Sequence, residues 1–171
     1  MKFLATIIKS VLPAAIGALA LGLGSTSVFA ATVTTTFQVT ADVQATCSIS
    51  VAAMNFGNYT GTITGEFGVN GDMTVVCSNG VPYNIGLNAG LGTGATVTSR
   101  AMTGPSSALL NYGLFQDAAH SVNWGDTVGT DTITGTGNGL AQTVTIFGQV
   151  SAGQFVAPGA YLDTITATIT F

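Results

Sequence analysis

Hydrophobic and polar residues alternate along two long segments of this chain. In the first segment one face would carry Val33, Thr35, Phe37, Val39, Ala41 and Val43. In the second segment, which reaches the last residue, the corresponding positions include Tyr161, Asp163, Ile165, Ala167, Ile169 and Phe171. A period of two places one set of side chains on a buried face and the other set in solvent. We therefore predict strands over residues 33–50 and 161–171.

Shorter strand signals fill the region between these two segments. They cover residues 63–69, 72–77, 82–88, 95–98, 109–116, 131–134 and 142–149. Turn-forming residues separate them, for example Asn70-Gly71-Asp72 and Ser78-Asn79-Gly80. Helix signals are nearly absent after residue 30. Many short strands with glycine-rich connections are typical of a β-sandwich.

The position of the two alternating segments at the chain ends adds a functional hypothesis. Strands at chain ends can form the edges of sheets, and an open edge can pair with a strand of another chain. In an exported protein such pairing can be the function itself.

The first 30 residues have the pattern of a secretory signal peptide. Lys2 and Lys9 provide positive charge, an uncharged and mostly apolar run covers residues 11–24, and Val28-Phe29-Ala30 fits the small-x-small cleavage rule. The alternative is an N-terminal membrane anchor, which Pro13 and several glycines in a short run make less fitting. We expect residue 31 to begin the mature protein.

Charge excludes one class of partner. After residue 30 the chain has a single basic residue, Arg100, against seven acidic residues, which gives a formal net charge of −6. A nucleic-acid-binding protein needs a basic surface to neutralise phosphates, and this chain has none. We therefore expect no nucleic-acid partner.

The two cysteines, Cys47 and Cys77, predict one disulfide bond because the chain is exported to an oxidising compartment. Such a crosslink stabilises a fold by about 3 to 4 kcal/mol when it is unstrained. A redox-active or metal-binding pair is the alternative. It is disfavoured because the cysteines lack the CxxC spacing and His120 is the only histidine.

The residues that could support catalysis or sugar binding are few. His120 has Asp117 and Asp126 nearby in sequence, but no serine or threonine lies in a glycine-flanked elbow. Trp124 and Tyr112 could stack on a carbohydrate, although an isolated tryptophan beside glycine more often packs at the edge of a core. We expect no enzyme activity, no cofactor and no metal site.

An ordered set of short motifs resembles a known family. The longest is Leu110-Asn111-Tyr112-Gly113-Leu114-Phe115-Gln116-Asp117, followed by Asn123-Trp124-Gly125-Asp126. Others include Phe56-Gly57-Asn58-Tyr59, Val75-Val76-Cys77, Ser99-Arg100-Ala101-Met102, Pro158-Gly159-Ala160-Tyr161 and Asp163-Thr164-Ile165. In this order, and over residues 31–171, they are similar to the spore coat protein U domain family, which includes the subunits of archaic, Csu-type chaperone–usher pili. One departure is Ile146-Phe147, where the family usually has a tyrosine.

This resemblance implies an all-β fold: an incomplete immunoglobulin-like β-sandwich that is completed by a donor strand. The implied partners are a periplasmic pilus chaperone, an outer-membrane usher and other copies of this chain or related pilins. The implied location is a surface pilus of a Gram-negative bacterium, reached through the periplasm, with roles in adhesion and biofilm formation. The family's paired cysteines correspond to Cys47 and Cys77.

Residue patterns and resemblance together predict three segments. Residues 1–30 form the signal peptide, residues 31–46 the donor-strand extension, and residues 47–171 the pilin domain. The groove that accepts a donor strand or a chaperone strand would lie beside the C-terminal strand, with Ile165, Ala167, Ile169 and Phe171 at its edge. The extension could instead fold back into its own domain and leave a monomer. The alternatives to a polymerising subunit are a tip adhesin and a non-polymerising surface coat protein.

Overall fold

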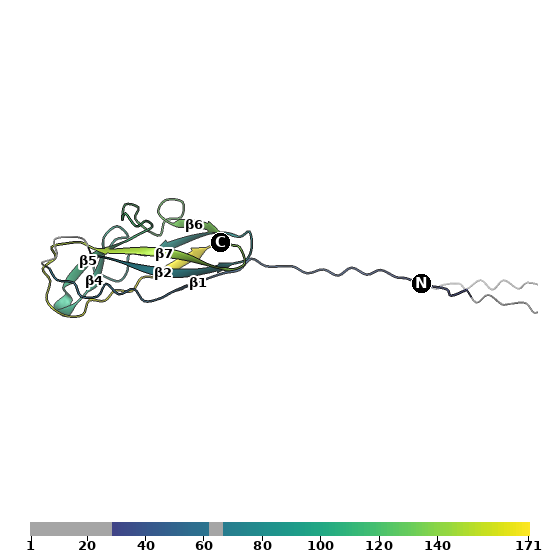
Figure 1. The fold of residues 1–171 in the computed structure, drawn as a ribbon, viewed down its shortest axis with the longest axis horizontal. Coiled ribbons are helices and arrows are strands. Elements are labelled where there is room, and N and C mark those ends of the chain that lie inside the picture. Colours follow the sequence, from purple (N-terminus) through teal and green to yellow (C-terminus); the bar gives the residue numbers. More distant parts are fainter. Residues whose placement is uncertain (1–28, 62–66) are drawn as a thin grey trace, which may run out of the picture. The chain divides into compact units, whose positions relative to one another are not determined.

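The part of the chain that the computed structural model describes, residues 29–61 and 67–171, contains eight strands and a single turn of 3₁₀ helix (Figure 1). The elements are β1 (Cys47–Val51), β2 (Phe67–Cys77), β3 (Pro82–Leu87), β4 (Arg100–Thr103), η1 (Pro105–Ser107), β5 (Leu109–Phe115), β6 (Ile133–Thr136), β7 (Ala141–Val150) and β8 (Ala167–Thr170). No helix among these residues is long and apolar enough to cross a membrane. The signal peptide prediction falls almost entirely outside the described residues.

The chain divides into two units, Met1–Ala41 and Asp42–Phe171. In the first unit, residues 29–41 form neither helix nor strand, and their side chains are exposed. The second unit contains all eight strands.

The strands of the second unit form two antiparallel sheets. The larger sheet has the order β1-β2-β7-β5-β4, and the smaller one has the order β6-β3-β8. The longest ladder joins β2 to β7, from Phe67 opposite Val150 to Val76 opposite Ala141. Strand β8 pairs only with β3, so it forms an edge of the smaller sheet.

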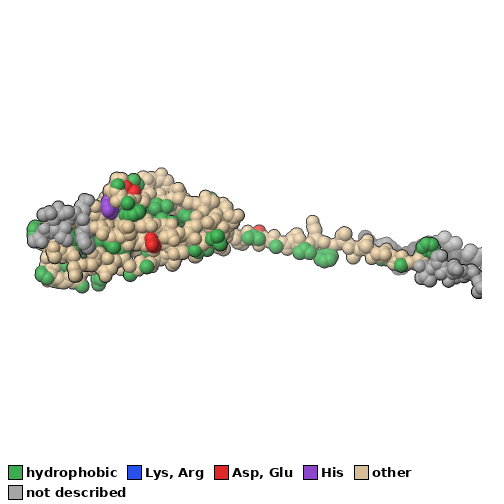
Figure 2. All heavy atoms as spheres, viewed as in Figure 1, with side chains coloured by type: hydrophobic (Ala, Val, Ile, Leu, Met, Phe, Trp, Pro, Cys, Tyr) green, Lys and Arg blue, Asp and Glu red, His purple; other side chains and the backbone are tan. Residues whose placement is uncertain are grey.

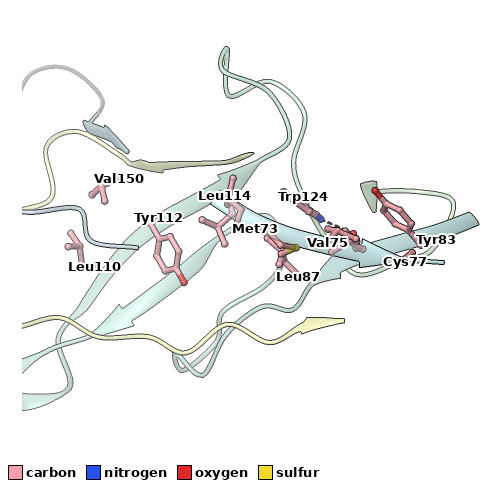
Figure 3. Close-up of a cluster of buried hydrophobic side chains, with 12 residues drawn as sticks. Met73, Val75, Cys77, Tyr83, Leu87, Leu110, Tyr112, Leu114, Trp124 and Val150 are labelled. Carbon is pink, nitrogen blue, oxygen red and sulfur yellow. Dashed lines mark hydrogen bonds between the residues drawn. The ribbon is translucent and has the colours of Figure 1, made fainter. Parts of the chain in front are cut away.

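The core follows the predicted alternation. Met73, Val75 and Cys77 of β2 are buried, as are Tyr83, Ile85 and Leu87 of β3. Figure 3 shows a row of buried side chains that runs from Leu110 and Val150 at one end to Tyr83 and Cys77 at the other. The predicted β-sandwich is thus confirmed, with inward-facing residues of both sheets filling the space between them.

Several predicted strands are confirmed, namely those at residues 82–88, 109–116 and 142–149. The strand predicted at residues 131–134 is shifted, because β6 covers Ile133–Thr136. The predicted turn at Asn70-Gly71-Asp72 is wrong, because β2 continues through it while pairing with Phe147, Ile146 and Thr145 of β7. The predicted strand at residues 95–98 is also wrong. Only a single bridge joins Thr96 to Ser99, and the strand in this region is β4. The predicted strand at residues 63–69 lies partly outside the described residues.

The two terminal strands are shorter than predicted. Of residues 33–50 only those from Cys47 onward form a strand, because only they have β2 as a partner. Of residues 161–171 only Ala167–Thr170 belong to a strand. Alternation therefore predicted the half-buried face of residues 161–170, but residues 33–46 are exposed on both faces because no partner strand is present there in the described part of the chain.

Candidate functional site

An apolar groove of about 550 Å³ opens beside the C-terminal segment of the second unit. One wall, the N-terminal wall, consists of Val51, Ala52, Ala53, Met54 and Phe56, which directly follow β1. The opposite wall, the C-terminal wall, consists of residues 161–165 and Ala167, which lead into β8. The floor comes from both sheets and consists of Leu87, Met102, Tyr112, Leu114 and Ile146.

Two side chains anchor the N-terminal wall to the larger sheet. Phe56 packs edge-on against Tyr112, with 5.7 Å between ring centroids. Met54 lies over Gly71 and Gly148, where a Cβ atom would come within 3.0 Å of the Met54 Cε and 2.9 Å of the Met54 Sδ, respectively. The glycines in β2 and β7 thus leave the room that the wall occupies.

The C-terminal wall connects the two sheets. Leu162 exchanges two backbone hydrogen bonds with Thr103 of β4, at 2.8 and 3.1 Å. Farther along, the Asn88 backbone N–H donates to the Thr166 carbonyl oxygen, and the Thr166 backbone N–H donates to the Asn88 side-chain Oδ1. The segment therefore crosses from the edge of the larger sheet to the edge of the smaller one.

Asp163 is the polar centre of the C-terminal wall. Its carboxylate accepts hydrogen bonds from the Tyr112 hydroxyl and from the backbone amides of Leu91 and Thr164, each at 2.7 Å. Burial of the phenol raises the pKa of Tyr112 well above its usual range, and the hydrogen bond to Asp163 raises it further. This pair fixes the wall to the floor of the groove.

Arg100 supports the same region from beneath. It is fully buried, and its guanidinium donates to the carbonyl oxygens of Asn88, Val97, Leu87 and Trp124 at 2.7 to 2.9 Å. Burial lowers the pKa of Arg100, and the nearby Tyr112 and Asp126 partly offset that effect. Because Leu87 is part of the groove floor, this cation holds the floor in place.

No exposed Lys or Arg is visible on the face shown in Figure 2, where small apolar groups lie among uncharged polar side chains.

Part of the backbone of each wall forms no backbone–backbone hydrogen bond with the described part of the chain. Among the described residues, no backbone–backbone hydrogen bond involves residues 52–58 or residues 163–165. The edge of β8 that faces away from β3 carries no strand in the described part of the chain. An added extended strand can pair with such backbone groups while its side chains enter the apolar floor, so this apolar slot has the properties of a binding site for an extended strand.

The predicted groove-edge residues lie at different depths. Ile165 and Ala167 line the groove, and Ile169 is half-buried against the core in β8. Phe171 follows the end of β8 and is 58% exposed. The prediction that Phe171 lies inside a strand is therefore wrong, because the ladder to β3 ends at Thr170.

The predicted donor residues are exposed. The exposed fractions are 94% for Val33, 84% for Phe37, 82% for Val39 and 88% for Val43, and Thr35 and Ala41 are exposed as well. Such large apolar side chains are costly to leave in water, at about 25 cal/mol per Å² of apolar surface. Their spacing would place them on one face if this segment became a strand.

Other candidate chemistry is not assembled in the structure. The Asp117 carboxylate accepts hydrogen bonds from the backbone N–H and hydroxyl of Ser121 and from the backbone N–H of Val122. The His120 ring packs against Phe115 instead of contacting this carboxylate. Trp124 is fully buried, and its indole N–H donates to the Ile85 carbonyl oxygen, which is drawn as a dashed line in Figure 3. Stacking of Trp124 on a carbohydrate is therefore ruled out in this fold.

The predicted disulfide is present and lies at the start of the domain. Cys47 bonds to Cys77, its direct partner in the β1–β2 register. Next to it, Ser78 donates its backbone N–H to the Thr46 carbonyl oxygen at 2.9 Å. The point where the N-terminal extension enters the sandwich is thus held to the end of β2.

Comparison with known proteins agrees with this architecture. Residues 33–168 match the Spore Coat Protein U domain. The chain is 36% identical to Protein U of Myxococcus xanthus over 157 residues, which is 83% of this chain and 87% of that protein.

Two solved structures share the fold. One is the CsuC-CsuE chaperone–tip adhesion subunit pre-assembly complex from archaic chaperone-usher Csu pili of Acinetobacter baumannii (TM-score 0.58, 22% identity). This likeness covers 75% of the present chain and 40% of that chain. The other is the P pilus rod subunit PapA (TM-score 0.51, 16% identity), with coverages of 72% and 97%. The predicted incomplete immunoglobulin-like sandwich is confirmed.

Proposed function

Because the chain belongs to the Spore Coat Protein U domain family, we propose that it is the structural subunit of a surface pilus and polymerises by donor-strand exchange. The observation that carries this proposal is the groove. Its apolar floor lies between two walls in which residues 52–58 and 163–165 form no backbone–backbone hydrogen bond with the described part of the chain. An inserted strand would hydrogen-bond to both walls and place alternate side chains on the floor.

The donor in this proposal is residues 31–46 of a neighbouring copy, and the acceptor domain is residues 47–171. Residues 1–30 act as the signal peptide. Val33, Phe37, Val39 and Val43 together contribute roughly 6 to 12 kcal/mol as an upper bound, at about 1.5 to 3 kcal/mol for each buried side chain. Hydrogen bonds along both walls add to this, so a seated donor strand dissociates slowly.

The same groove provides the contact with the assembly machinery. A periplasmic chaperone fills it with a strand of its own before polymerisation, and an outer-membrane usher is where the exchange takes place. The fibre is then displayed on the surface of a Gram-negative cell, where it supports adhesion and biofilm formation. In this role the protein is not an enzyme.

A pair of matched variants tests the proposal. Val39→Asp places a carboxylate on the apolar face of the donor segment, where burial without a partner costs several kcal/mol. Thr40→Asp adds the same charge to the opposite face. Electron microscopy of cells should show no fibres for Val39→Asp and normal fibres for Thr40→Asp, while both proteins still form the complex with the chaperone before assembly. Abundant normal fibres from Val39→Asp would refute the donor role.

Deletion of residues 31–43 separates polymerisation from the remaining alternatives. A subunit without its donor segment should still fold with a chaperone and accept a strand, yet form no fibre. Loss of folding together with loss of fibres would instead favour a self-complemented monomer. The likeness to Protein U makes a non-polymerising coat protein the second candidate. It predicts that the intact protein covers the cell surface without any fibre.

A further inference from the structure

The proposed donor segment and one wall of the groove are consecutive in the chain. Residues 31–46 lead directly into β1, and β1 leads directly into the N-terminal wall, which begins at Val51. In a fibre, any tension on the extension therefore enters the subunit at the strand whose other end shapes the groove.

Strand β1 alone is a weak anchor for such a load. It is an edge strand that pairs only with β2, over five residue pairs from Cys47–Cys77 to Val51–Met73. Residues 52–58, which follow it, form no backbone–backbone hydrogen bonds among the described residues. A pull that separated β1 from β2 would continue into the N-terminal wall and open the groove that holds the next subunit.

The disulfide lies at the first residue pair that such a pull would reach. Cys47 is the first residue of β1, and its sulfur is bonded to Cys77, the last residue of β2. Two hydrogen bonds also hold the adjacent Thr46 to Ser78. The Ser78 backbone N–H donates to the Thr46 carbonyl oxygen at 2.9 Å, and the Thr46 backbone N–H donates to the Ser78 Oγ at 3.2 Å. Strand β2 is in turn paired with β7 over ten residue pairs, in the interior of the larger sheet.

We propose that the Cys47–Cys77 disulfide is a force-bearing crosslink, which transfers tension on the N-terminal extension to β2 and so keeps β1 and the N-terminal wall unloaded. The inference rests on the proposed polymerisation. It assigns the crosslink a second role beyond stability. A subunit that is pulled by one neighbour keeps the donor strand of the other neighbour in its groove.

Measurement of fibre lifetime under constant load tests this role. Single fibres of the wild-type protein and of the Cys47→Ala/Cys77→Ala double variant are held at a fixed force until a subunit link breaks. We expect the lifetime of a link under load to fall at least tenfold in the double variant. Without load, spontaneous breakage of the two kinds of fibre should be similar.

Two controls separate the mechanical role from a general loss of stability. Leu110→Ala removes buried volume from β5, which does not pair with β1, and keeps the disulfide. Its fibres should keep most of the wild-type lifetime under load. Fibres assembled from the wild-type protein and then treated with a thiol reductant should behave like the double variant, and this comparison does not require the variant to fold.

The outcomes distinguish the inference from the proposal beneath it. Fibres that form from both proteins and have equal lifetimes under load would overturn the force-bearing role and leave polymerisation intact. A shortening of the same size in Leu110→Ala would overturn it as well, since stability alone would then explain the effect. Absence of fibres from the wild-type protein would overturn the proposed function and, with it, this inference.

Discussion

The Tyr112 hydroxyl donates to the Asp163 carboxylate at 2.7 Å, which joins the floor of the groove to its C-terminal wall. Tyr112 comes from the middle of β5, and Asp163 lies outside any strand. The bond therefore holds an irregular segment against a regular sheet at the place where the proposed donor strand is accepted.

Tyr112→Phe should lower the free energy of unfolding by about 1 to 3 kcal/mol, because the partly buried Asp163 carboxylate loses one of its donors. The variant should also change the response to alkaline pH. The pKa of Tyr112 is raised in the folded state above its ordinary value of 10.0. The protonated phenol therefore stabilises the fold fully below pH 10, and this contribution is lost as the pH rises above 10.

Urea denaturation at pH 8 and at several values above pH 10 checks both effects. The wild-type protein should lose stability with rising pH more steeply than Tyr112→Phe does, so that the difference between the two proteins narrows. If the two free energies of unfolding differed by the same amount at every pH in this range, the loss of stability at alkaline pH could not be assigned to Tyr112.

Arg100 gives a second prediction about the support of the groove. Arg100→Met should lower the free energy of unfolding by about 3 to 5 kcal/mol, because four carbonyl oxygens, two buried and two partly buried, lose their charged donor. Arg100→Lys keeps the charge but not the planar fork that reaches several acceptors at once. Denaturant midpoints should therefore place Arg100→Lys well below the wild-type protein and above Arg100→Met. A lysine variant as stable as the wild type would show that charge alone is sufficient.

The contrast between core and groove shows how much the sequence predicts. Alternation in Met73-Thr74-Val75 and in Tyr83-Asn84-Ile85 reports burial directly, because each side chain meets the opposite sheet. Alternation from Val33 to Val43 looks the same in the sequence, yet this segment forms no strand, because a strand also requires a partner. Pattern shows what a segment can bury but not which chain buries it.

The N-terminal wall was not predicted from sequence. Ala52, Ala53 and Met54 have no periodic pattern, and Phe56-Gly57-Asn58-Tyr59 suggested a turn and contributed to the family resemblance. Gly71 suggested a turn as well, but it lies in the interior of β2 beneath Met54. The available signal was the pair of glycines in otherwise regular strands, Gly71 and Gly148, since a glycine inside a strand often marks the close approach of another group.

Gly148 gives a third prediction, which concerns this wall. A Cβ at this position would lie 2.9 Å from both the Met54 Sδ and the Phe56 Cζ, so that Gly148→Ala must displace the wall. We expect a loss of about 1 to 3 kcal/mol, typical of overpacking, together with weaker binding of a synthetic peptide of residues 31–46. Gly68→Ala in β2 is the matched control, because its Cβ would make only ordinary contacts at 3.5 Å. Equal peptide affinities of the two variants would contradict the assigned wall.

The last prediction concerns the depth of the groove edge. Ile165 lines the groove, whereas Phe171 lies beyond β8 and is 58% exposed. Ile165→Asp places an unpartnered carboxylate beside the apolar floor, at a cost of several kcal/mol when a strand covers it. It should abolish co-purification with the chaperone and lead to degradation in the periplasm. Phe171→Asp should weaken the complex less, because its ring is already largely in water.

Thr168→Asp is the control for both substitutions, since Thr168 lies in β8 with its side chain exposed. It adds the same charge to the same segment and should leave the yield of the chaperone complex unchanged. The measurement is the amount of subunit retained on an affinity-tagged chaperone, with each variant expressed at the same level. The expected order of retention is Thr168→Asp, then Phe171→Asp, then Ile165→Asp. If Phe171→Asp lost binding as completely as Ile165→Asp, the acceptor groove would extend past the end of β8 to the last residue of the chain.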